Sequence, residues 1–364
     1  MTPNPSSAVI LIPSLEPDHR LPDYAAALIA RGFTRLVVVD DGSSQACQPI
    51  FGQLSAMPGV TVLHHDVNHG KGVALKTGYA WIRDHLPDIS GVITADADGQ
   101  HTVEDCWRLA EALSENKRAL YLGSRDFNQP HVPARSSFGN KTTSMVFWAL
   151  YGQYLQDTQT GLRAFRREEL PFMLNIAGER YEYEMNVLIA CARAGMPMLP
   201  LTIETVYENN NEGSHFHPVR DSIRIYRVIL GSFIRFMGAS LASFLIDQGA
   251  FAVMEHLVLA NVGWTLNVIQ LVSTVTARLI SAPCNFLMNR SLVFRFKQDT
   301  RSAALKYAAL CAALLLLSWL GVALLSLLGM PKALDNLSKL IIDTVLYFLS
   351  YRVQNRWIFQ EAKA

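Results

Sequence analysis

Three oxygen-bearing side chains, Asp96, Asp98 and Gln100, stand at alternating positions directly after the apolar run 91–95. Alternate side chains of an extended strand point the same way. We therefore expect all three at the carboxyl edge of a sheet, where open α/β folds bind their ligands. Oxygen ligands suit a hard cation, Mg2+ or Mn2+, which keeps open positions for substrate phosphates. The segment predicts a metal site that serves a diphosphate-bearing substrate.

Two further polar turns follow expected strands. Asp40-Asp41-Gly42-Ser43 offers carboxylates that can accept from a nucleobase imide and from ribose hydroxyls, although such a turn caps a helix equally well. Gly70-Lys71-Gly72 offers a cation and flexible amides to a diphosphate, but it lacks the spacing of a P-loop. Together the turns indicate one functional edge.

The elements that must position these turns alternate between short β-branched runs and helical stretches. This alternation is typical of a mostly parallel sheet covered by helices on both faces. We expect helices over Tyr24 to Arg31 and Ala74 to His85, which end before Gly32 and Pro87. The expected strands are Ala8 to Ile12, Arg35 to Val39, Val60 to His64, Gly91 to Ala95 and Ala119 to Gly123.

Bulk composition excludes some classes of protein. The 364 residues hold 32 Lys+Arg against 31 Asp+Glu, so no overall basic field argues for a nucleic-acid partner. Five scattered cysteines without a Cys-x-x-Cys pair predict reduced thiols, with neither zinc nor a disulfide framework. The first residues lack the basic and apolar regions of a secretory signal, which predicts a cytoplasmic front half.

The sequence of the last third of the chain predicts a membrane-embedded domain. A basic amphipathic helix, Val219 to Phe233, suits the membrane interface, although a surface helix of a soluble domain has the same pattern. Four apolar segments predict a four-helix transmembrane domain. They are 236–254, 262–286, 307–331 and 337–351. We expect three parts, 1–216, 217–234 and 235–364.

Cations in this part predict its orientation. Five of them crowd the middle loop, 290–306, and three more, Arg352, Arg356 and Lys363, follow the last apolar segment. The positive-inside rule then places the catalytic part, the middle loop and both termini of a multi-pass inner-membrane protein in the cytoplasm. Segments 285–294 and 351–359 also resemble each other, each with an Asn-Arg pair shortly before a Phe, which predicts a duplicated helix hairpin.

Residues 8–205 resemble the family 2 glycosyltransferases, and among them the dolichyl-phosphate mannose synthase-like group that charges polyprenyl phosphate with a sugar. The motifs that carry the resemblance are the two acidic turns, Gly123-Ser-Arg125 and Asp157-Thr-Gln-Thr-Gly-Leu-Arg-Ala-Phe165. Residues 235–359 resemble a GtrA-like membrane domain through Asn285-Phe-Leu-Met-Asn-Arg290. The resemblance implies a GT-A type fold. One position departs from the family, because Leu15 replaces the usual asparagine of the first loop.

The resemblance also implies roles for single residues. Asp98, Asp157 and Arg125 are the expected catalytic residues, and Glu182 and Glu184 are expected near the site. Asp96, Asp98 and Gln100 would hold the Mg2+ or Mn2+. The acceptor phosphate would be gripped by Arg125, Arg135 and Lys141. The nucleotide sugar would be bound by Pro13, Glu16, Asp40, Asp41, Lys71 and Asp96.

These assignments predict an inverting, metal-dependent transferase that moves one sugar from a nucleotide-sugar donor to polyprenyl phosphate at the cytoplasmic membrane face. Two alternatives stay open. The membrane part could translocate the lipid-linked sugar, because Asp247, Arg278 and Asp343 are charges inside apolar segments. A processive polysaccharide synthase is the other, although its Gln-x-x-Arg-Trp motif is missing before the helices. The sequence leaves homo-oligomerisation open.

Overall fold

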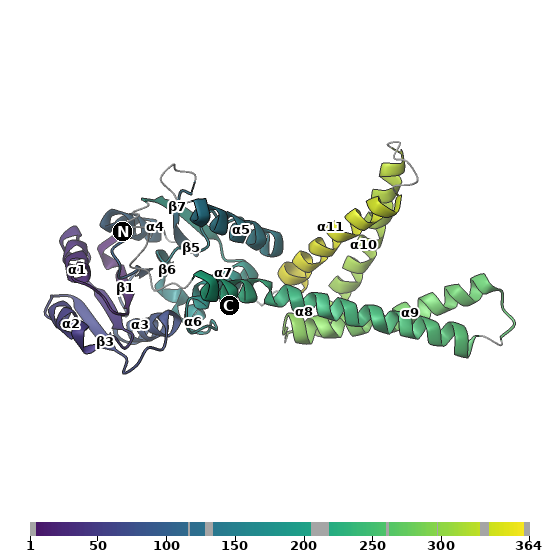
Figure 1. The fold of residues 1–364 in the computed structure, drawn as a ribbon, viewed down its shortest axis with the longest axis horizontal. Helices are drawn as coiled ribbons and strands as arrows, with labels where there is room; N and C mark the ends of the chain where they lie inside the picture. Colours follow the sequence, from purple (N-terminus) through teal and green to yellow (C-terminus); the bar gives the residue numbers. More distant parts are fainter. Residues whose placement is uncertain are drawn as a thin grey trace. The chain divides into compact units, whose positions relative to one another are not determined.

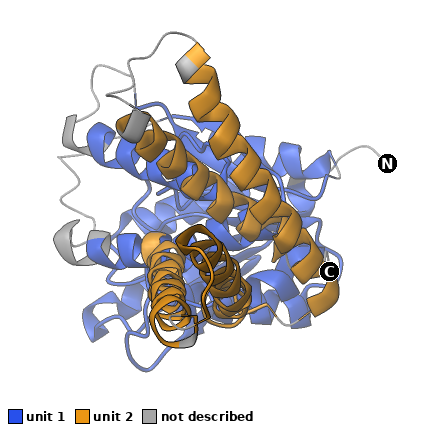
Figure 2. Ribbon diagram, turned by 90° about the vertical axis from the view of Figure 1, so that its right-hand side faces the viewer, with its two compact units in different colours: residues 1–229 blue, residues 230–364 orange. Residues whose placement is uncertain are grey.

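The computed structural model describes residues 5–115, 117–127, 134–204, 218–259, 262–296, 298–327 and 335–359. The chain divides into two compact units, residues 1–229 and 230–364 (Figure 2). The boundary expected at residue 216 falls in segment 205–217, which lies outside the described residues.

Unit 1 contains one seven-stranded sheet with the strand order β3-β2-β1-β4-β6-β5-β7. Strand β6 pairs antiparallel with β4 and β5, and every other pairing is parallel. This confirms the expected mostly parallel sheet. The strands are β1 (Val9–Ser14), β2 (Leu36–Asp40), β3 (Val60–His64), β4 (Gly91–Thr94), β5 (Leu120–Arg125), β6 (Arg163–Arg166) and β7 (Met198–Ile203).

The five strands expected from the sequence are confirmed, with ends that shift by at most about two residues, which is the usual scatter of strand boundaries. Strands β6 and β7 were missed. Strand β6 has only four residues and an arginine at each end, so it shows no apolar run. Strand β7 contains Pro200, which a sheet tolerates at an edge position such as this one.

Helices cover both faces of the sheet (Figure 1). Residues of α1, α2 and α4 share one core cluster with Ile10, Val38 and Ile93 of the strands. On the other face α3 packs on β1 and β2, with Gly78 against Leu11. The helices of unit 1 are α1 (Arg20–Arg31), α2 (Gln48–Ser55), α3 (Lys71–His85), α4 (Val103–Ser114), α5 (Ala134–Tyr151), α6 (Leu170–Leu174) and α7 (Glu182–Ala194), with short turns at η1 (Pro5–Ser7), η2 (Gln45–Cys47) and η3 (Arg167–Glu169).

Helix α3 begins three residues earlier than expected, at Lys71. Gly70, with φ +104°, precedes it in a backbone conformation that side chains other than glycine rarely adopt. The glycine therefore lets the chain turn so that Lys71 starts the helix at the carboxyl edge of the sheet.

From Pro218 onward the described residues are mainly helical. Its helices are α8 (Pro218–Val253), α9 (Leu266–Met288), α10 (Thr300–Leu327) and α11 (Asp335–Val353), with π-helical turns at η5 (Met254–Val258), η6 (Asn289–Val293) and η8 (Gln354–Ile358). Helix α8 covers both the expected basic helix and the first expected span without a break.

Three stretches of the described residues are long and apolar enough to cross a membrane: Ile223–Leu257, Leu266–Val293 and Thr300–Leu325. The fourth expected span forms a helix, α11, but it carries Lys339 and Asp343 in its middle. These two side chains form an ion pair at 3.0 Å, and Asp343 also accepts from Ser318 of α10. The charges lower the hydropathy of α11 below that of the other three helices.

The two similar segments of the sequence occupy equivalent places in unit 2. Each forms a π-helical turn, η6 after α9 and η8 after α11. Asn289 of the first donates to the side chain of Gln354 in the second, at 3.1 Å. Phe294 and Phe359, which follow the two turns, stack with ring centroids 4.9 Å apart. The repeat is thus expressed as two matched turns that pack on each other.

Candidate active site at the carboxyl edge of the sheet

The polar turns converge because their strands are parallel neighbours. Ser14 at the end of β1 is in register with Asp40 at the end of β2, and Leu11 is in register with Thr94 at the end of β4. The loops that leave these strands therefore start side by side at one edge. They carry Glu16, the pair Asp40 and Asp41, and the pair Asp96 and Asp98.

A half-buried charge network surrounds Asp96. The Lys71 ammonium lies 2.7 Å from the Asp96 carboxylate and 3.0 Å from that of Glu184 in α7. The Nε2 atom of His101 lies 3.1 Å from the other Asp96 oxygen. One lysine thus joins the turn after β4 to the first turn of α7. From the sequence we expected Lys71 and Asp96 to bind the nucleotide-sugar donor, and in the structure their side chains are in contact.

The ion pairs of this network keep Lys71 and Asp96 in their charged forms. Burial by itself would favour the neutral forms of Lys71 and Asp96. For Asp96, the opposing attraction of Lys71 and His101 is stronger and holds its pKa well below the usual range. For Lys71, the carboxylates of Asp96 and Glu184 likewise overcome burial and raise its pKa. Both side chains are therefore ionised around neutral pH.

Asp98 differs from Asp96 in what surrounds it. Both carboxylates are partly exposed, but the Asp98 Oδ1 accepts from the backbone N–H of Gln100 at 3.1 Å, where Asp96 contacts a lysine and a histidine. Burial and the nearby negative charge of Asp96 raise the pKa of Asp98. An added cation beside it would relieve this repulsion.

The carboxylates at this edge meet some of the requirements of a hard cation. The described residues contain no cluster of three His, Cys, Asp or Glu side chains arranged to hold a metal ion. Mg2+, however, is usually held by one or two carboxylates together with water and substrate phosphates. Asp98, whose charge is least compensated, and Asp96 supply such a pair, with Gln100 beside them.

Asp40 and Asp41 are held by hydrogen bonds to the loops after β2 and β3. Asp40, 2 % exposed, accepts from the Ser43 N–H at 2.8 Å and contacts the His64 ring at 3.0 Å. Burial opposes ionisation, but these hydrogen bonds lower the pKa of Asp40 overall. Asp41, 3 % exposed, accepts from the His65 ring at 2.7 Å and from backbone N–H groups of the turn at 69–70. Asp41 therefore shapes the turn that starts α3.

Glu16 joins the first two loops. Its carboxylate accepts from the N–H and the hydroxyl of Ser44, at 2.6 and 2.9 Å, and its own N–H donates to Ser43. Its φ of +50° is unusual for a residue other than glycine. Pro13 lies half-buried near the end of β1. Both residues stand at the edge where the sequence placed them.

Arg125 and Asp157 form one ion pair. The Arg125 Nε and Nη2 atoms donate to the two Asp157 oxygens at 2.7 and 3.3 Å, and the Asp157 carboxylate is fully buried. Such a forked pair orients the guanidinium firmly. Lys141 is exposed on α5. Arg135 belongs to the first turn of α5, and its side chain lies outside the described part of the chain.

Family comparisons agree with these two units. Residues 10–168 match the model of glycosyl transferase family 2, and residues 235–359 match that of the GtrA/DPMS transmembrane domain. The chain joins a family 2 glycosyltransferase domain to a GtrA/DPMS transmembrane domain. The resemblance inferred from the sequence is thereby confirmed for both parts.

Several relatives of the transferase domain are named glycosyltransferases or glycosyl-transferring synthases. The UDP-N-acetylglucosamine–dolichyl-phosphate N-acetylglucosaminyltransferase of Methanococcus voltae is 26% identical over 54% of this chain and 85% of its own length. The undecaprenyl-phosphate mannosyltransferase of Micrococcus luteus is 29% identical over 47% of this chain and 71% of its own. The Mycobacterium tuberculosis glucosyl-3-phosphoglycerate synthase, solved with Mn2+, UDP and phosphoglyceric acid, is 16% identical with a TM-score of 0.45 and covers 62% of this chain and 77% of its own.

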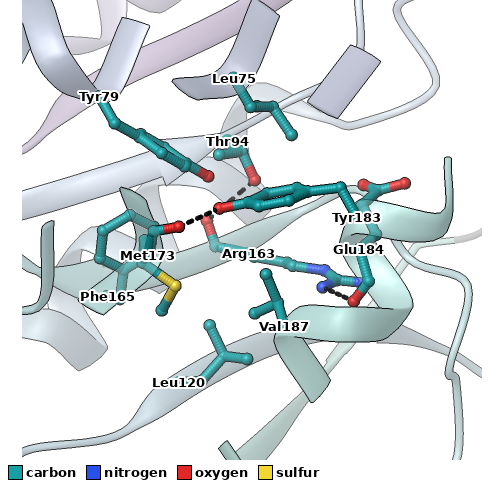
Figure 3. Close-up of a pocket in the computed structure, with 10 residues that line it drawn as sticks. All are labelled: Leu75, Tyr79, Thr94, Leu120, Arg163, Phe165, Met173, Tyr183, Glu184 and Val187. Carbon is teal, nitrogen blue, oxygen red and sulfur yellow. Dashed lines mark hydrogen bonds between the residues drawn. The ribbon is translucent and has the colours of Figure 1, made fainter. Parts of the chain in front are cut away.

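Two site residues of the transferase domain were missed by sequence reasoning although they lie in the quoted 157–165 motif. A Cβ atom at Gly161 would overlap the Asp96 carboxylate, so only glycine fits there without a shift. Arg163 is 4 % exposed and donates to the backbone carbonyl of Thr160 at 2.9 Å. It also donates to that of Glu184 at 2.7 Å (Figure 3). Its position between β4 and α7 could not be predicted from the sequence, because strand β6, which carries it, was not predicted.

The two glutamates expected near the site, Glu182 and Glu184 of α7, have different surroundings. Glu184 reaches Lys71 and is part of the network. Glu182 instead accepts from the backbone N–H groups of Glu179 and Arg180, at 3.1 and 3.2 Å. Only one of the two glutamates thus lies in the site, because the helical repeat turns them about 200° apart.

Proposed function

We propose that this chain transfers a single sugar from a nucleotide-sugar donor to polyprenyl phosphate at the cytoplasmic face of the inner membrane, with inversion at the anomeric carbon. The observation that carries the proposal is the network of Lys71, Asp96 and Glu184 with Asp98 beside it. It combines carboxylates and a lysine at the ligand-binding edge of a family 2 domain that is fused to a transmembrane domain. The acceptors in the names of these relatives, dolichyl and undecaprenyl phosphate, support the same acceptor class.

At the donor end, the reaction requires stabilisation of the negative charge on the leaving group. The bond between the anomeric carbon and the diphosphate oxygen breaks, and the nucleoside diphosphate leaves with the electron pair. A divalent cation bound between this site and the diphosphate would neutralise the charge that develops on that leaving group. Asp98 and Asp96, with Gln100, would hold that cation, and Lys71 would face the diphosphate. Pro13, Glu16, Asp40 and Asp41 would line the nucleoside side.

The acceptor end needs positioning more than deprotonation. A phosphate monoester is largely dianionic at neutral pH, since its second pKa is near 6. Its oxygen can therefore form the new bond to the anomeric carbon without a strong general base. Arg125, held by Asp157, and Lys141 with Arg135 would orient this phosphate. The Arg125–Asp157 pair fits this role because the carboxylate fixes the direction of the fork while one quarter of the arginine side chain stays accessible.

The membrane unit is proposed first as an anchor of four helices, α8 to α11, with the middle loop and both termini in the cytoplasm. Its intramembrane carboxylates are paired within their own helix hairpins. Asp247 of α8 accepts from Ser281 of α9 at 2.7 Å and lies 3.6 Å from Arg278, while Asp343 is bonded to Ser318 and Lys339. Such pairing satisfies the charge and ties helices together, as a packed anchor requires.

The test uses the purified full chain in detergent with Mg2+ or Mn2+, undecaprenyl phosphate and a panel of labelled nucleotide sugars. We expect a lipid-extractable product from one donor that carries one sugar per lipid, and no product after chelation with EDTA. Asp98→Asn is expected to form product about 10²–10³-fold more slowly, whereas Asp88→Asn, an exposed aspartate elsewhere in the domain, should match the unaltered chain. Products with several sugars per lipid would favour a processive synthase, and the absence of product with every donor would contradict the proposal.

A further inference from the structure

The segment that leads into β6 touches both residues whose carboxylates hold Lys71. Gly161 lies so close to the Asp96 carboxylate that a Cβ atom there would overlap it. Two residues later, the Arg163 Nη1 atom donates to the backbone carbonyl of Glu184 at 2.7 Å (Figure 3). The Lys71 ammonium lies between Asp96 and Glu184, at 2.7 and 3.0 Å from their carboxylates. One short segment therefore lies beside both ends of the bridge that this lysine makes.

The sheet holds this segment in place. Strand β6 lies between β4 and β5, and Arg163 is in register with Thr94 at the end of β4. The Thr94 hydroxyl donates to the Gly161 carbonyl at 2.7 Å, and the Arg163 Nε atom donates to the Thr160 carbonyl at 2.9 Å. Through its second hydrogen bond, to Glu184, the guanidinium thus ties the first turn of α7 to an interior strand of the sheet.

The Arg163 side chain is too deeply buried to contact a substrate. It is 4 % exposed and lines a cavity of about 10 Å³ together with Tyr79, Tyr183 and Glu184 (Figure 3). That volume is about what one water molecule needs. Neither a nucleotide sugar nor a lipid phosphate fits there, so any influence of Arg163 on sugar transfer must pass through the residues that it holds.

The two acceptors of Arg163 differ in what they can transmit. The Thr160 carbonyl belongs to the same turn as the arginine, whereas the Glu184 carbonyl belongs to another element. A hydrogen bond from a charged donor is about twice as strong as one between neutral groups. Without the guanidinium, the first turn of α7 loses this tie to β6, and the Glu184 carboxylate is free to move away from Lys71. The path of influence therefore runs from Arg163 through Glu184 to Lys71.

We propose that Arg163 is a positioning residue of the donor site. It acts through Glu184 to hold the Lys71 ammonium beside Asp96, where the diphosphate and the divalent cation would bind. The inference rests on the proposed function for the identity of the ligand at this edge. Because the acceptor phosphate would bind elsewhere on the edge, loss of Arg163 should weaken the contacts of the donor and leave those of the acceptor unchanged.

The first experiment measures binding at the donor site without sugar transfer. The full chain in detergent is titrated with Mn2+ in the presence of inorganic pyrophosphate, and free Mn2+ is followed by electron paramagnetic resonance. Arg163→Met removes every donor and fills part of the same space. It should weaken binding of Mn2+ with pyrophosphate about tenfold or more, the effect of losing a hydrogen bond from a charged group.

Arg167→Met is the matched control. Arg167 also donates to two backbone carbonyls, at 3.1 and 3.2 Å, but it lies beyond the end of β6 that pairs with the start of β4, at the opposite edge of the sheet. Its replacement removes the same kind of contact and should lower the midpoint of thermal unfolding. Binding of Mn2+ with pyrophosphate should stay as in the unaltered chain.

A double-mutant cycle tests whether Arg163 acts through Glu184. Glu184→Gln alone should weaken binding about tenfold, because the charge that holds Lys71 is lost. Adding Arg163→Met to Glu184→Gln should then weaken binding little further, since both changes break the same path. If Arg163 supported the fold alone, the two effects would multiply.

Steady-state kinetics separate positioning from a loss of folded protein. With the donor that the transfer assay identifies, Arg163→Met should raise the KM for the nucleotide sugar about tenfold and leave the KM for undecaprenyl phosphate unchanged. Partial unfolding would instead lower kcat and change neither KM. If Arg163→Met did not fold, Arg163→Lys would replace it. The lysine keeps a buried cation but lacks the fork for two carbonyls, and it should weaken binding at least about threefold.

Equal binding of Mn2+ with pyrophosphate by the unaltered chain and the Arg163 variant would overturn the proposal. Multiplying effects in the cycle, or an unaltered chain that does not bind this pair, would overturn it as well. An unaltered chain that binds the pair, with the expected loss in Arg163→Met, but transfers no sugar would refute the proposed function alone. Sugar transfer with unchanged binding in the variant would refute the positioning role alone.

Discussion

Two acidic turns leave the same edge of the sheet, and they differ in what holds their carboxylates. Asp40 and Asp41 after β2 are almost fully buried and accept mainly from backbone N–H groups and histidine rings. Asp96 after β4 is held by a lysine and a histidine, and Asp98 is partly exposed with a raised pKa. The first turn is therefore satisfied by the protein itself, whereas the second retains negative charge that a ligand could use.

The strongest test of this contrast is Asp98→Asn. It should lower the initial rate of lipid-linked product formation by about 10²–10³-fold, because the variant loses the least compensated charge beside the proposed diphosphate site. Thermal stability should stay the same or rise slightly, since repulsion from Asp96 is removed. A rate above one tenth of the unaltered chain would place the catalytic charge elsewhere.

Gly161→Ala tests how closely Asp96 is positioned. The added methyl group overlaps the Asp96 carboxylate, which must move from its contacts with Lys71 and His101. We expect a rate loss of up to about 10²-fold, the scale of a misplacement near 1 Å. Gly52→Ala in α2, where a Cβ meets no atom within 4 Å, is the matched control and should leave the rate unchanged.

Asp41→Asn tests the other turn. One acceptor oxygen becomes an NH2 group that faces the donors of the 69–70 turn, so we expect a loss of about 1–3 kcal/mol in the free energy of unfolding. The measurement is the midpoint of thermal unfolding of the solubilised chain, with Asp88→Asn as the exposed control. An unchanged midpoint together with a large loss of nucleotide-sugar binding would show that Asp41 serves the ligand and not the loop.

The smallest effect concerns cysteine labelling, which checks that these variants keep the fold. Burial raises the pKa of Cys106 to about 12, where it contacts Tyr24, and that of Cys191 to about 12 as well. At pH 8 on the order of one thiol in 10⁴ would be ionised. Neither should react with iodoacetamide in the unaltered chain or in Asp98→Asn. Rapid labelling of Cys106 in Gly161→Ala would show that its rate loss reflects unfolding.

The sequence by itself determined the edge of the site. Apolar runs of strand length ending in Asp40-Asp41 and Asp96-Ala-Asp98 were sufficient, because parallel neighbouring strands end at one edge. Apolar length likewise predicted four spans, and three of them form helices long and apolar enough to cross a membrane. These features depend on local patterns of side chains, which a single sequence displays.

Only the tertiary structure decided how the charges are paired. Lys71 meets Glu184 across 113 positions of the chain because α3 and α7 pack on each other, and Arg125 meets Asp157 because their segments approach at the same edge. The antiparallel strand β6 places Arg163 and Gly161 beside β4, yet its four residues show no strand pattern. Whether a carboxylate organises its own loop or stays available to a ligand depends on such partners, which come from distant parts of the chain.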